Sequence, residues 1–375
     1  MKIAHFSSSP CGEKSLNGVL GTIAHLASAT KKLGHDVHIF SCGHSPVESF
    51  VYSVPQSCIF PLSNNRQTAR KVVSAITAWG ANFVHLHSVY TPLNEAIARE
   101  LHTKGISYTV TPNGGLNAAN EKKGRFKKMV YRTLFSNSTF KNSAFIHSVG
   151  DTQGIKFFYP DVPVVEAPNG FDPELAGIRK KDLSLSENNP ARFLQLLFIG
   201  RLTVEQKGLD LLLEALGSDE CSKFHLDLAG PGDEKNLTAI NSMIDRFNLS
   251  ERVKISGPIF GEEKRTKLSS CDIFVHASRW EGMPLAVLEA AAVGCYCVVT
   301  EAADPMGIIK KTGWGQSTKA ELETFRKGLV KAGQMSVEKR DQDANQLASL
   351  VKERFSWEKS AAILVKKYTE VLDRA

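Results

Sequence analysis

The sequence has no long apolar segment and no Cys-x-x-Cys pair, and we expect no signal peptide at its start. It contains no run of about 18 uncharged apolar residues, because the closest stretch, 284–299, is interrupted by Glu289 and Gly294. It also contains no Cys-x-x-Cys pair, and residues 1–6 are too polar for the start of a signal peptide. These absences exclude a membrane channel, a fibrous protein and a secreted disulfide scaffold.

The seven cysteines are odd in number and irregularly spaced. In a chain without a leader, this pattern is typical of buried, reduced thiols in a cytosol. We therefore expect a cytoplasmic protein with its cysteines reduced, and we expect Cys295-x-Cys297 to alternate along a buried strand.

Length and composition indicate two globular domains. At about 150 residues per domain, a chain of 375 residues supplies two cores, and 42% hydrophobic with 23% charged residues is ordinary for a globular protein. The net charge of +7 is unevenly spread, since residues 1–170 carry 17 Lys and Arg against 9 Asp and Glu, whereas the remainder is nearly neutral. The excess lies mostly in residues 122–135.

Short apolar runs alternate with segments of helical periodicity along the chain. The runs predict strands at 3–6, 37–40, 83–87, 108–111, 194–200, 224–229, 253–256, 273–276 and 296–300. The periodic segments predict helices at 16–33, 93–103, 209–216, 235–247, 262–269 and 285–293, with helices alone over 320–373. Because the alternation restarts after a turn rich in Pro and Gly at 168–173, we expect an α/β protein with two parallel, doubly wound domains.

Two cations follow the strand predicted at 194–200, in a loop of the kind where open parallel sheets bind ligands. Gly200-Arg201 ends this strand, and Lys207-Gly208 precedes the next helix. A guanidinium and an ammonium at this spacing can converge on a diphosphate. The alternative is that both are ordinary solvated surface charges.

A second segment, 278–289, carries a loop, a helix start and two carboxylates. Gly282 allows a tight loop, and Pro284 suits the first position of a helix whose free amides favour an anion. Glu281 lies in the loop, whereas Glu289 falls within an otherwise apolar helix and therefore requires a partner. A ribose diol would supply that partner by donating both hydroxyl protons, and a buried salt bridge is the alternative.

Glycines elsewhere give weaker signals. Gly18 precedes the first helix and would let backbone approach a phosphate. Gly230-x-Gly232 follows a strand and is more typical of a wall beside a flat base than of a phosphate cradle. Neither a G-x-G-x-x-G fingerprint nor a Walker A sequence occurs, so the dinucleotide and P-loop signatures are missing.

The sequence predicts no metal site. Asp341-x-Asp343 is the only Asp-x-Asp, and its charged surroundings indicate a solvated helix face. His85-x-His87, at the end of a strand, has no evident third ligand, which favours a contact to the acceptor or a structural role over a metal.

Together these motifs resemble family 4 of the retaining glycosyltransferases, which have the GT-B fold. The resemblance rests on Gly200-Arg201 with Lys207-Gly208, on Gly230-x-Gly232, and on the Glu-x7-Glu segment Glu281-Gly282-Met283-Pro284-Leu285 to Glu289. Two further matches extend the likeness over nearly the whole chain, namely Asn169-Gly170-x-Asp172 at the hinge and Phe355-Ser356-Trp357 before the last helix.

The resemblance implies two Rossmann-like domains that face each other across a cleft. Residues 1–168 would form the acceptor-side domain, and residues 169–356 would bind the nucleotide-sugar. A final helix at about 357–375 would pack back on the first domain.

The resemblance also implies roles for individual residues. By the family pattern, Arg201 and Lys207 neutralise the diphosphate, Glu289 binds the ribose and Glu281 lies by the donor sugar. The nucleotide-sugar is a substrate, so no cofactor and no metal are expected. The expected nucleotide-sugar site comprises Gly18, which would close over the phosphates from the other domain, and Gly200, Arg201, Lys207, Gly230, Glu281, Gly282, Met283, Pro284, Leu285 and Glu289.

One departure from the family pattern concerns Asn113. The family usually places a histidine beside the donor sugar after the strand near residue 110, whereas this chain has Thr111-Pro112-Asn113. An asparagine hydrogen-bonds a hydroxyl or the reacting oxygen but cannot titrate. We therefore expect Asn113 to position donor or acceptor without transferring a proton, which a leaving phosphate oxygen can accept in a front-face attack.

Residues 122–135 interleave six cations with apolar side chains. Such a segment can lie on an anionic membrane and would suit a lipid-linked acceptor, whereas the alternative is an amphipathic helix that covers the sheet. The charge is local and no nucleic-acid-binding module is recognisable, so no nucleic-acid partner is expected.

The sequence therefore predicts a retaining, metal-independent hexosyltransferase that moves a sugar from a nucleotide-sugar to a glycan or a lipid-linked saccharide. By analogy, we expect it to act in bacterial surface polysaccharide synthesis, at the inner face of the cell membrane. Two alternatives share the architecture: a sugar-nucleotide 2-epimerase, which would require titratable acid and base groups in the cleft, and a non-catalytic protein that binds sugar nucleotides.

Overall fold

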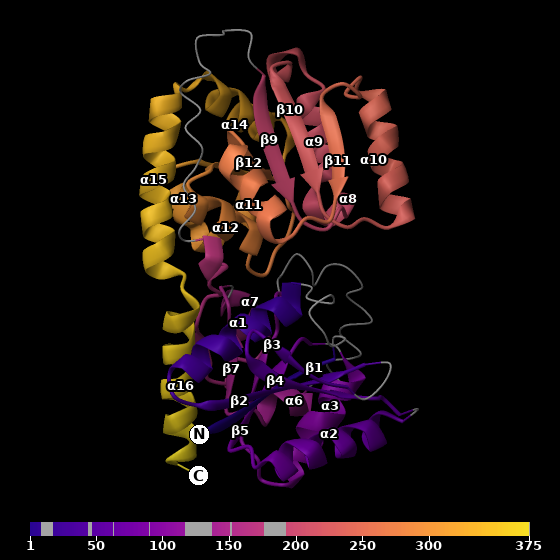
Figure 1. Ribbon diagram of the computed structural model, residues 1–375, viewed down its shortest axis with the longest axis vertical. Helices are drawn as coiled ribbons and strands as arrows, with labels where there is room; N and C mark the ends of the chain where they lie inside the picture. The colour runs from indigo at the N-terminus through magenta and orange to yellow at the C-terminus, as the bar shows by residue number, and fades with distance from the viewer. Residues whose placement is uncertain are drawn as a thin grey trace. The chain divides into compact units, whose positions relative to one another are not determined.

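The computed structural model describes residues 1–8, 18–43, 47–62, 64–89, 91–116, 137–150, 152–175 and 193–374. The chain divides into two compact α/β units (Figure 1). The first unit comprises Met1–Gly170 together with Ser356–Ala375, and the second comprises Phe171–Phe355. The C-terminal helix thus belongs to the same unit as the N-terminus.

The first unit is built on an eight-stranded sheet in the order β3-β4-β2-β1-β5-β6-β7-β8. Its strands are β1 (Lys2–Ser7), β2 (Asp36–Cys42), β3 (Val47–Val51), β4 (Val54–Ile59), β5 (Phe83–His87), β6 (Tyr108–Thr111), β7 (Phe145–Ser148) and β8 (Val164–Glu166). Its helices are α1 (Gly18–Lys32), α2 (Asn65–Trp79), α3 (Pro92–Thr103), α6 (Asn137–Lys141), α7 (Thr152–Phe158) and α16 (Trp357–Leu372). Neighbouring strands run parallel, except that β3 pairs antiparallel with β4 at the edge.

The second unit has a six-stranded, fully parallel sheet in the order β11-β10-β9-β12-β13-β14. Its strands are β9 (Leu194–Ile199), β10 (Phe224–Ala229), β11 (Val253–Gly257), β12 (Ile273–His276), β13 (Tyr296–Thr300) and β14 (Gln316–Thr318). Its helices are α8 (Val204–Lys207), α9 (Leu209–Leu216), α10 (Glu234–Arg246), α11 (Gly261–Ser270), α12 (Leu285–Val293), α13 (Ile308–Thr312), α14 (Leu322–Gln334) and α15 (Val337–Arg354). The expected α/β architecture with parallel sheets is therefore confirmed.

Burial explains why the central strands are continuous apolar runs. Helices cover both faces of a parallel sheet, so every side chain of a central strand faces a core. All residues of β5, β12 and β13 are buried. Each unit has apolar clusters of its own: β9, β10, α9 and α14 meet in one of the second unit, and β1, β5, α2 and α3 meet in one of the first.

The last helix, α16, packs against α1 within the first unit (Figure 1). Its N-cap is Ser356, and its buried side chains include Trp357 and Tyr368. Gly170 lies so close to this helix that an added Cβ would stand 2.5 Å from the backbone nitrogen of Trp357. A side chain at position 170 would therefore force α16 away from the end of the first unit.

Two expectations concern membranes and thiols. Among the described helices, none is both long enough and apolar enough to cross a membrane. Cys295 and Cys297 are fully buried free thiols, as expected for a core position. Cys58, however, is disulfide-bonded, so the expectation of a wholly reduced set is wrong for this residue. Spacing along a chain does not reveal a pair that only folding brings together.

Candidate functional site

The topology of the second sheet brings two of the predicted segments to one edge. Chain order reverses where β9 lies beside β12, and ligands of open parallel sheets bind beyond the carboxyl ends of the strands at such a point. Gly200 directly follows β9, and the loop that begins at Ala277 directly follows β12. The cationic segment and the carboxylate segment therefore meet at the switch point of this unit.

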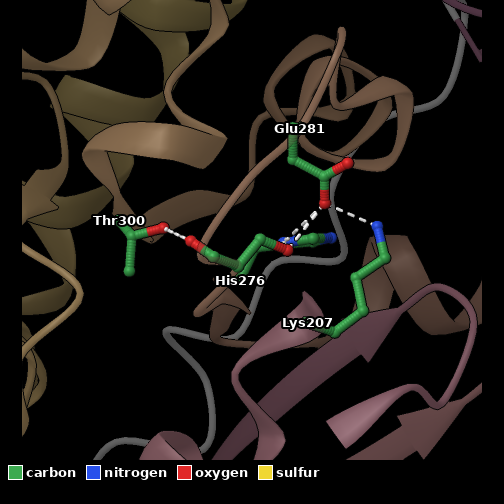
Figure 2. A network of polar contacts seen from close by, with 5 residues as sticks. Lys207, His276, Glu281 and Thr300 are labelled. Atoms are coloured by element: carbon green, nitrogen blue, oxygen red, sulfur yellow. Dashed lines mark hydrogen bonds and ion pairs between the residues drawn. The ribbon is translucent and has the colours of Figure 1, made fainter. Parts of the chain in front are cut away.

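Lys207 and Glu281 form an ion pair at this edge (Figure 2). Lys207 Nζ lies 2.5 Å from Glu281 Oε1, and the two side chains are only 12% and 9% exposed. Lys207 ends α8, whereas Glu281 lies in the loop after β12, 74 residues further along the chain. Lys207 is therefore not a solvated surface charge.

The electrostatics of this pair keep Glu281 ionised. Glu281 Oε1 also accepts a hydrogen bond from Ser278 Oγ at 2.6 Å. Burial by itself raises the pKa of a carboxyl, but the charge of Lys207 and the hydrogen bonds lower the pKa of Glu281 below its ordinary value. Burial, assisted by the charge of Lys207, lowers the pKa of His276 to about 3. At neutral pH, a carboxylate and an uncharged imidazole therefore share this site.

Ser278, His276 and Thr300 belong to the same network, although the sequence analysis assigned none of them a role. Ser278 Oγ lies 3.0 Å from His276 Nδ1, and Thr300 Oγ1 donates to the carbonyl of Ser278 at 2.5 Å (Figure 2). His276 ends β12 and Thr300 ends the neighbouring strand β13. A lone hydroxyl or imidazole at a strand end carries no spacing signal, so only the pairing of these strands reveals the network.

Contacts between α8, α9 and the loop after β12 fix the lysine–glutamate pair. The guanidinium of Arg279 donates a hydrogen bond to each carboxylate oxygen of Asp210, both at 2.8 Å. Gly208 has a φ of 60°, and an added Cβ would stand 2.0 Å from the carbonyl oxygen of Ala277. Glycine at position 208 therefore lets two backbone segments touch, which sets α8 directly against the loop.

Glu289 lies on α12 and pairs with Lys264 of α11. Its Oε2 stands 2.7 Å from Lys264 Nζ, and the side chains are 12% and 20% exposed. Burial raises the pKa of Glu289, while the charge and hydrogen bond of Lys264 oppose that shift. The partner that the apolar helix requires is thus supplied within the chain by a salt bridge.

Arg201, Gly200 and Gly230 also lie at this edge. Arg201 is exposed and has no ion pair with any described residue. Gly230 has a φ of 150°, and an added Cβ would stand 1.8 Å from the carbonyl oxygen of Gly200. The close approach of the ends of β9 and β10 is therefore sufficient reason for glycine at position 230.

The segment before α12 differs from the prediction by one residue. Pro284 is the N-cap with a ψ of 84°, and the helix begins at Leu285, so Pro284 does not occupy the first helical position. A proline fixes φ but not ψ, and here ψ lies outside the helical range. Gly282 and Met283 are half-buried in the loop before it.

Two predicted residues, Gly18 and Asn113, lie in the first unit. Gly18 is the first residue of α1, is exposed, and has no atom within 4 Å of an added Cβ. Asn113 follows β6 and has a φ of 49°, a conformation that asparagine tolerates better than most residues. Its Nδ2 is buried without a hydrogen-bond partner among the described residues. Asn113 therefore combines a strained backbone with an unused donor, features that gather at functional sites.

Buried histidines gather at the switch point of the first sheet, where β1 lies beside β5. Nitrogen atoms of His5, His85 and His87 lie within 4.8 Å of one another. The interpretation that His85-x-His87 has no third candidate ligand is therefore wrong. His5 joins the pair because β1 and β5 place His5 opposite His85.

Hydrogen bonds occupy both ring nitrogens of His85, so this cluster is not a ready metal site. Tyr368 Oη lies 2.7 Å from His85 Nδ1, and Thr111 Oγ1 lies 2.5 Å from His85 Nε2. Of the ring nitrogens in this cluster, His5 Nε2 and His87 Nδ1 have no hydrogen-bond partner among the described residues, and two ligands fall short of the three or four of a zinc site. We therefore interpret the cluster as a structural network.

Two further sequence predictions concern Asp341-x-Asp343 and the basic segment 122–135. Asp343 is buried and accepts from Lys339 Nζ at 2.7 Å, so the expectation of a solvated face is wrong for this residue. The reason is that α15 packs against α12 and β13, which turns this side of the helix inward. The basic segment 122–135 lies outside the described residues.

Models of known protein families match segments of both units. The family model described as Glycosyltransferase Family 4 matches residues 16–175, and the model described as Glycosyl transferases group 1 matches residues 194–330. The chain is 27% identical over 239 residues to UDP-Gal:alpha-D-GlcNAc-diphosphoundecaprenol alpha-1,3-galactosyltransferase of Escherichia coli, over 58% of this chain and 57% of that protein. It is 31% identical over 112 residues to mannosylfructose-phosphate synthase of Agrobacterium fabrum, over 28% and 24%. The matches thus span less than two thirds of each relative.

Solved structures share the fold along the whole chain. Sucrose-phosphate synthase from Thermosynechococcus elongatus superposes with a TM-score of 0.79 at 17% identity, over 100% of both chains. Anabaena HepE, in complex with UDP and glucose, superposes with a TM-score of 0.76 at 16% identity, over 99% of this chain and 100% of that one. These likenesses confirm the predicted GT-B fold class of two Rossmann-like domains.

Proposed function

Because the chain belongs to family 4 of the glycosyltransferases, we propose that it transfers a hexosyl group from a nucleotide-sugar to a saccharide or lipid-linked acceptor with retention of configuration. The observation that carries this proposal is the nearly buried Lys207–Glu281 pair at the switch point of the second sheet. A cation and a carboxylate fixed side by side suit a donor that presents a diphosphate next to sugar hydroxyls.

The proposed transfer reaction requires the second unit to stabilise a leaving diphosphate. Negative charge grows on the diphosphate as the glycosidic bond loosens, and preorganised cations lower the energy of that state. Lys207 is held in place by Glu281, and exposed Arg201 has no competing ion pair among the described residues. The N-terminal end of α12 adds the positive end of the helix dipole.

The remaining predicted residues bind the rest of the donor in this proposal. Glu289 binds the ribose while its carboxylate stays paired with Lys264. Glu281 faces the donor sugar, and Gly18 contributes backbone to the phosphates. Asn113 uses its unpaired Nδ2 to position donor or acceptor, and the acceptor's proton passes to the leaving phosphate oxygen.

For the acceptor we propose a growing glycan or a lipid-linked saccharide at the cytoplasmic face of a bacterial membrane. The Escherichia coli relative acts, by its name, on a diphosphoundecaprenol-linked sugar. The net positive charge of residues 1–170 supports an anionic surface as partner, with residues 122–135 as the contact. Loss of binding to anionic vesicles at low salt, after the cations of 122–135 are neutralised, would support this; vesicles that never bind the protein would refute it.

A thermal-shift screen against UDP-, GDP-, ADP- and dTDP-sugars tests the donor. A ligand that binds only the folded chain raises its stability in proportion to affinity. The sugar-nucleotide that stabilises the protein is then incubated with it, with and without acceptor. Release of nucleotide with an α-configured product from an α-donor supports the proposal. An epimerised donor would indicate a 2-epimerase, and binding without turnover would indicate a non-catalytic protein.

A further inference from the structure

The polar groups around Glu281 form a chain of hydrogen bonds (Figure 2). The donor and the acceptor of each bond follow from the chemistry of the two groups. Ionised Glu281 only accepts, so Lys207 Nζ at 2.5 Å and Ser278 Oγ at 2.6 Å both donate to its Oε1. A serine hydroxyl has a single proton, so Ser278 Oγ accepts from His276 Nδ1, which lies 3.0 Å away. His276 is therefore the neutral tautomer with its proton on Nδ1.

The end of this hydrogen-bond chain that lies at the sheet is held in place. His276 and Ser278 are 1% and 0% exposed, and Thr300 Oγ1 fixes the backbone of Ser278 through its carbonyl. Among the described residues, the charges that act on Glu281 are those of Lys207 from α8 and His276 from β12. Arg279 of the same loop is engaged by Asp210 on α9.

Lys207 interacts with two negatively charged groups in this proposal. In the structure it binds Glu281, and in the proposed reaction it also binds the donor diphosphate. If Lys207 were the only group that held Glu281, the carboxylate would move whenever the lysine turned toward a phosphate. Ser278 supplies a second donor that does not face the ligand, so Glu281 keeps its orientation when the lysine is shared.

We propose that His276 and Ser278 are positioning residues that hold the Glu281 carboxylate, and through it Lys207, in the geometry that the donor requires. This inference rests on the proposed function, because it assigns a task within the same site. Neither residue touches the donor, and both act through Glu281.

Paired variants test the hydrogen-bond chain from His276 through Ser278 to Glu281. Ser278→Ala and His276→Leu remove a donor, whereas Ser278→Thr keeps the hydroxyl and His276→Asn keeps an N–H near the position of Nδ1. We expect kcat/KM for the donor to fall about 10- to 100-fold in the first two variants, since each weakens a hydrogen bond to a charged group. We expect the second two to retain most activity. Ser218→Ala, which removes a hydroxyl bonded to the carbonyl of Ala215 at the end of α9, is the control for loss of a serine.

The pH profile separates positioning from a purely structural role. The hydrogen bond from Ser278 helps to hold the pKa of Glu281 low, so its loss raises that pKa. The acid limb of kcat/KM should therefore move to higher pH in Ser278→Ala and in His276→Leu, but not in Ser218→Ala. An unmoved acid limb in a folded Ser278→Ala protein, or wild-type kinetics in His276→Leu, would overturn the inference.

A measurement on the wild-type protein needs neither activity nor a stable variant. Nitrogen NMR of ¹⁵N-histidine-labelled protein should show His276 as the Nδ1–H tautomer, uncharged from pH 8 to pH 5, with the signal assigned by its loss in His276→Asn. The opposite tautomer would overturn the inference. If no sugar-nucleotide binds the wild-type protein while this tautomer is found, the proposed function fails and the hydrogen-bond chain stands.

Discussion

The four fully buried histidines of the first unit make a strong prediction about its acid stability. Burial lowers the pKa of His5 to about 3 and that of His147 to about 4, and it lowers the pKa values of His85 and His87 well below the ordinary value. In the unfolded chain each imidazole titrates near pH 6.5. Below that pH the unfolded state binds more protons than the native state, so stability is complete above pH 6.5 and falls as pH decreases toward 4.

The size of the effect follows from linkage. One histidine that stays neutral costs about 1.4 kcal/mol of stability for each pH unit below 6.5, so four cost about 5–6 kcal/mol at pH 5.5. This is a large part of the 5–15 kcal/mol typical of a domain. The second unit has one fully buried histidine, His276, and should lose about a quarter as much. We therefore expect the first unit to be the more acid-sensitive of the two.

Hydrogen exchange read by mass spectrometry on peptides from β5 and β6 measures the opening of the first unit. Peptides from β9 and β10 serve as the internal comparison, after correction for the pH dependence of intrinsic exchange. His5→Leu removes one titrating ring with its unpaired Nε2 and should flatten the pH dependence by about one proton. His102→Gln, at an exposed position of α3, should not change it. Equal protection of the first unit at pH 7.5 and pH 5.5 would refute the reasoning.

Four further predictions concern the site and its frame. Arg201→Ala should slow nucleotide release about 100- to 1,000-fold, because it removes a cation from the leaving diphosphate, and near-normal turnover would contradict that role. Asn113→His should not add a pH dependence near neutrality, and a much faster enzyme with a new titration would show that a base is needed there. Gly208→Ala should destabilise the second unit by roughly 2–3 kcal/mol or more in urea unfolding, since its Cβ meets a backbone carbonyl, whereas Gly18→Ala, with nothing within 4 Å, should not. Chelators should leave activity unchanged, and an activity lost to chelator and restored by magnesium or manganese would refute metal independence.

Local pattern was sufficient to predict the central strands. β5, β6, β10, β12 and β13 have the predicted bounds, as do α9 and α12. Strands buried on both faces are short continuous apolar runs, and the helices between them repeat every three to four residues. The strands β3, β4, β7, β8 and β14 and the helix α2 were not predicted. β4 contains Pro55, Gln56 and Ser57, so its polar residues and proline interrupt any apolar run.

The location of the site was also available from the sequence. Once alternating strands and helices indicate parallel sheets, the loops after the strands must share one edge, and Gly200-Arg201 and Glu281 lie in such loops. The roles of these residues came from the resemblance to a family. Neither source assigned a role to Ser278, His276 or Thr300, because one hydroxyl or imidazole has no period.

Partners were decided by tertiary structure alone. Lys207 meets Glu281 across 74 residues, Lys264 meets Glu289 on a neighbouring helix, and His5 meets His87 across 82 residues. The sequence determined which segments become strands, which loops follow them and which charges those loops carry. Strand order determined which of these groups touch, because hydrogen bonds and ion pairs act over a few ångströms in space, whereas a sequence orders residues only by their separation along the chain.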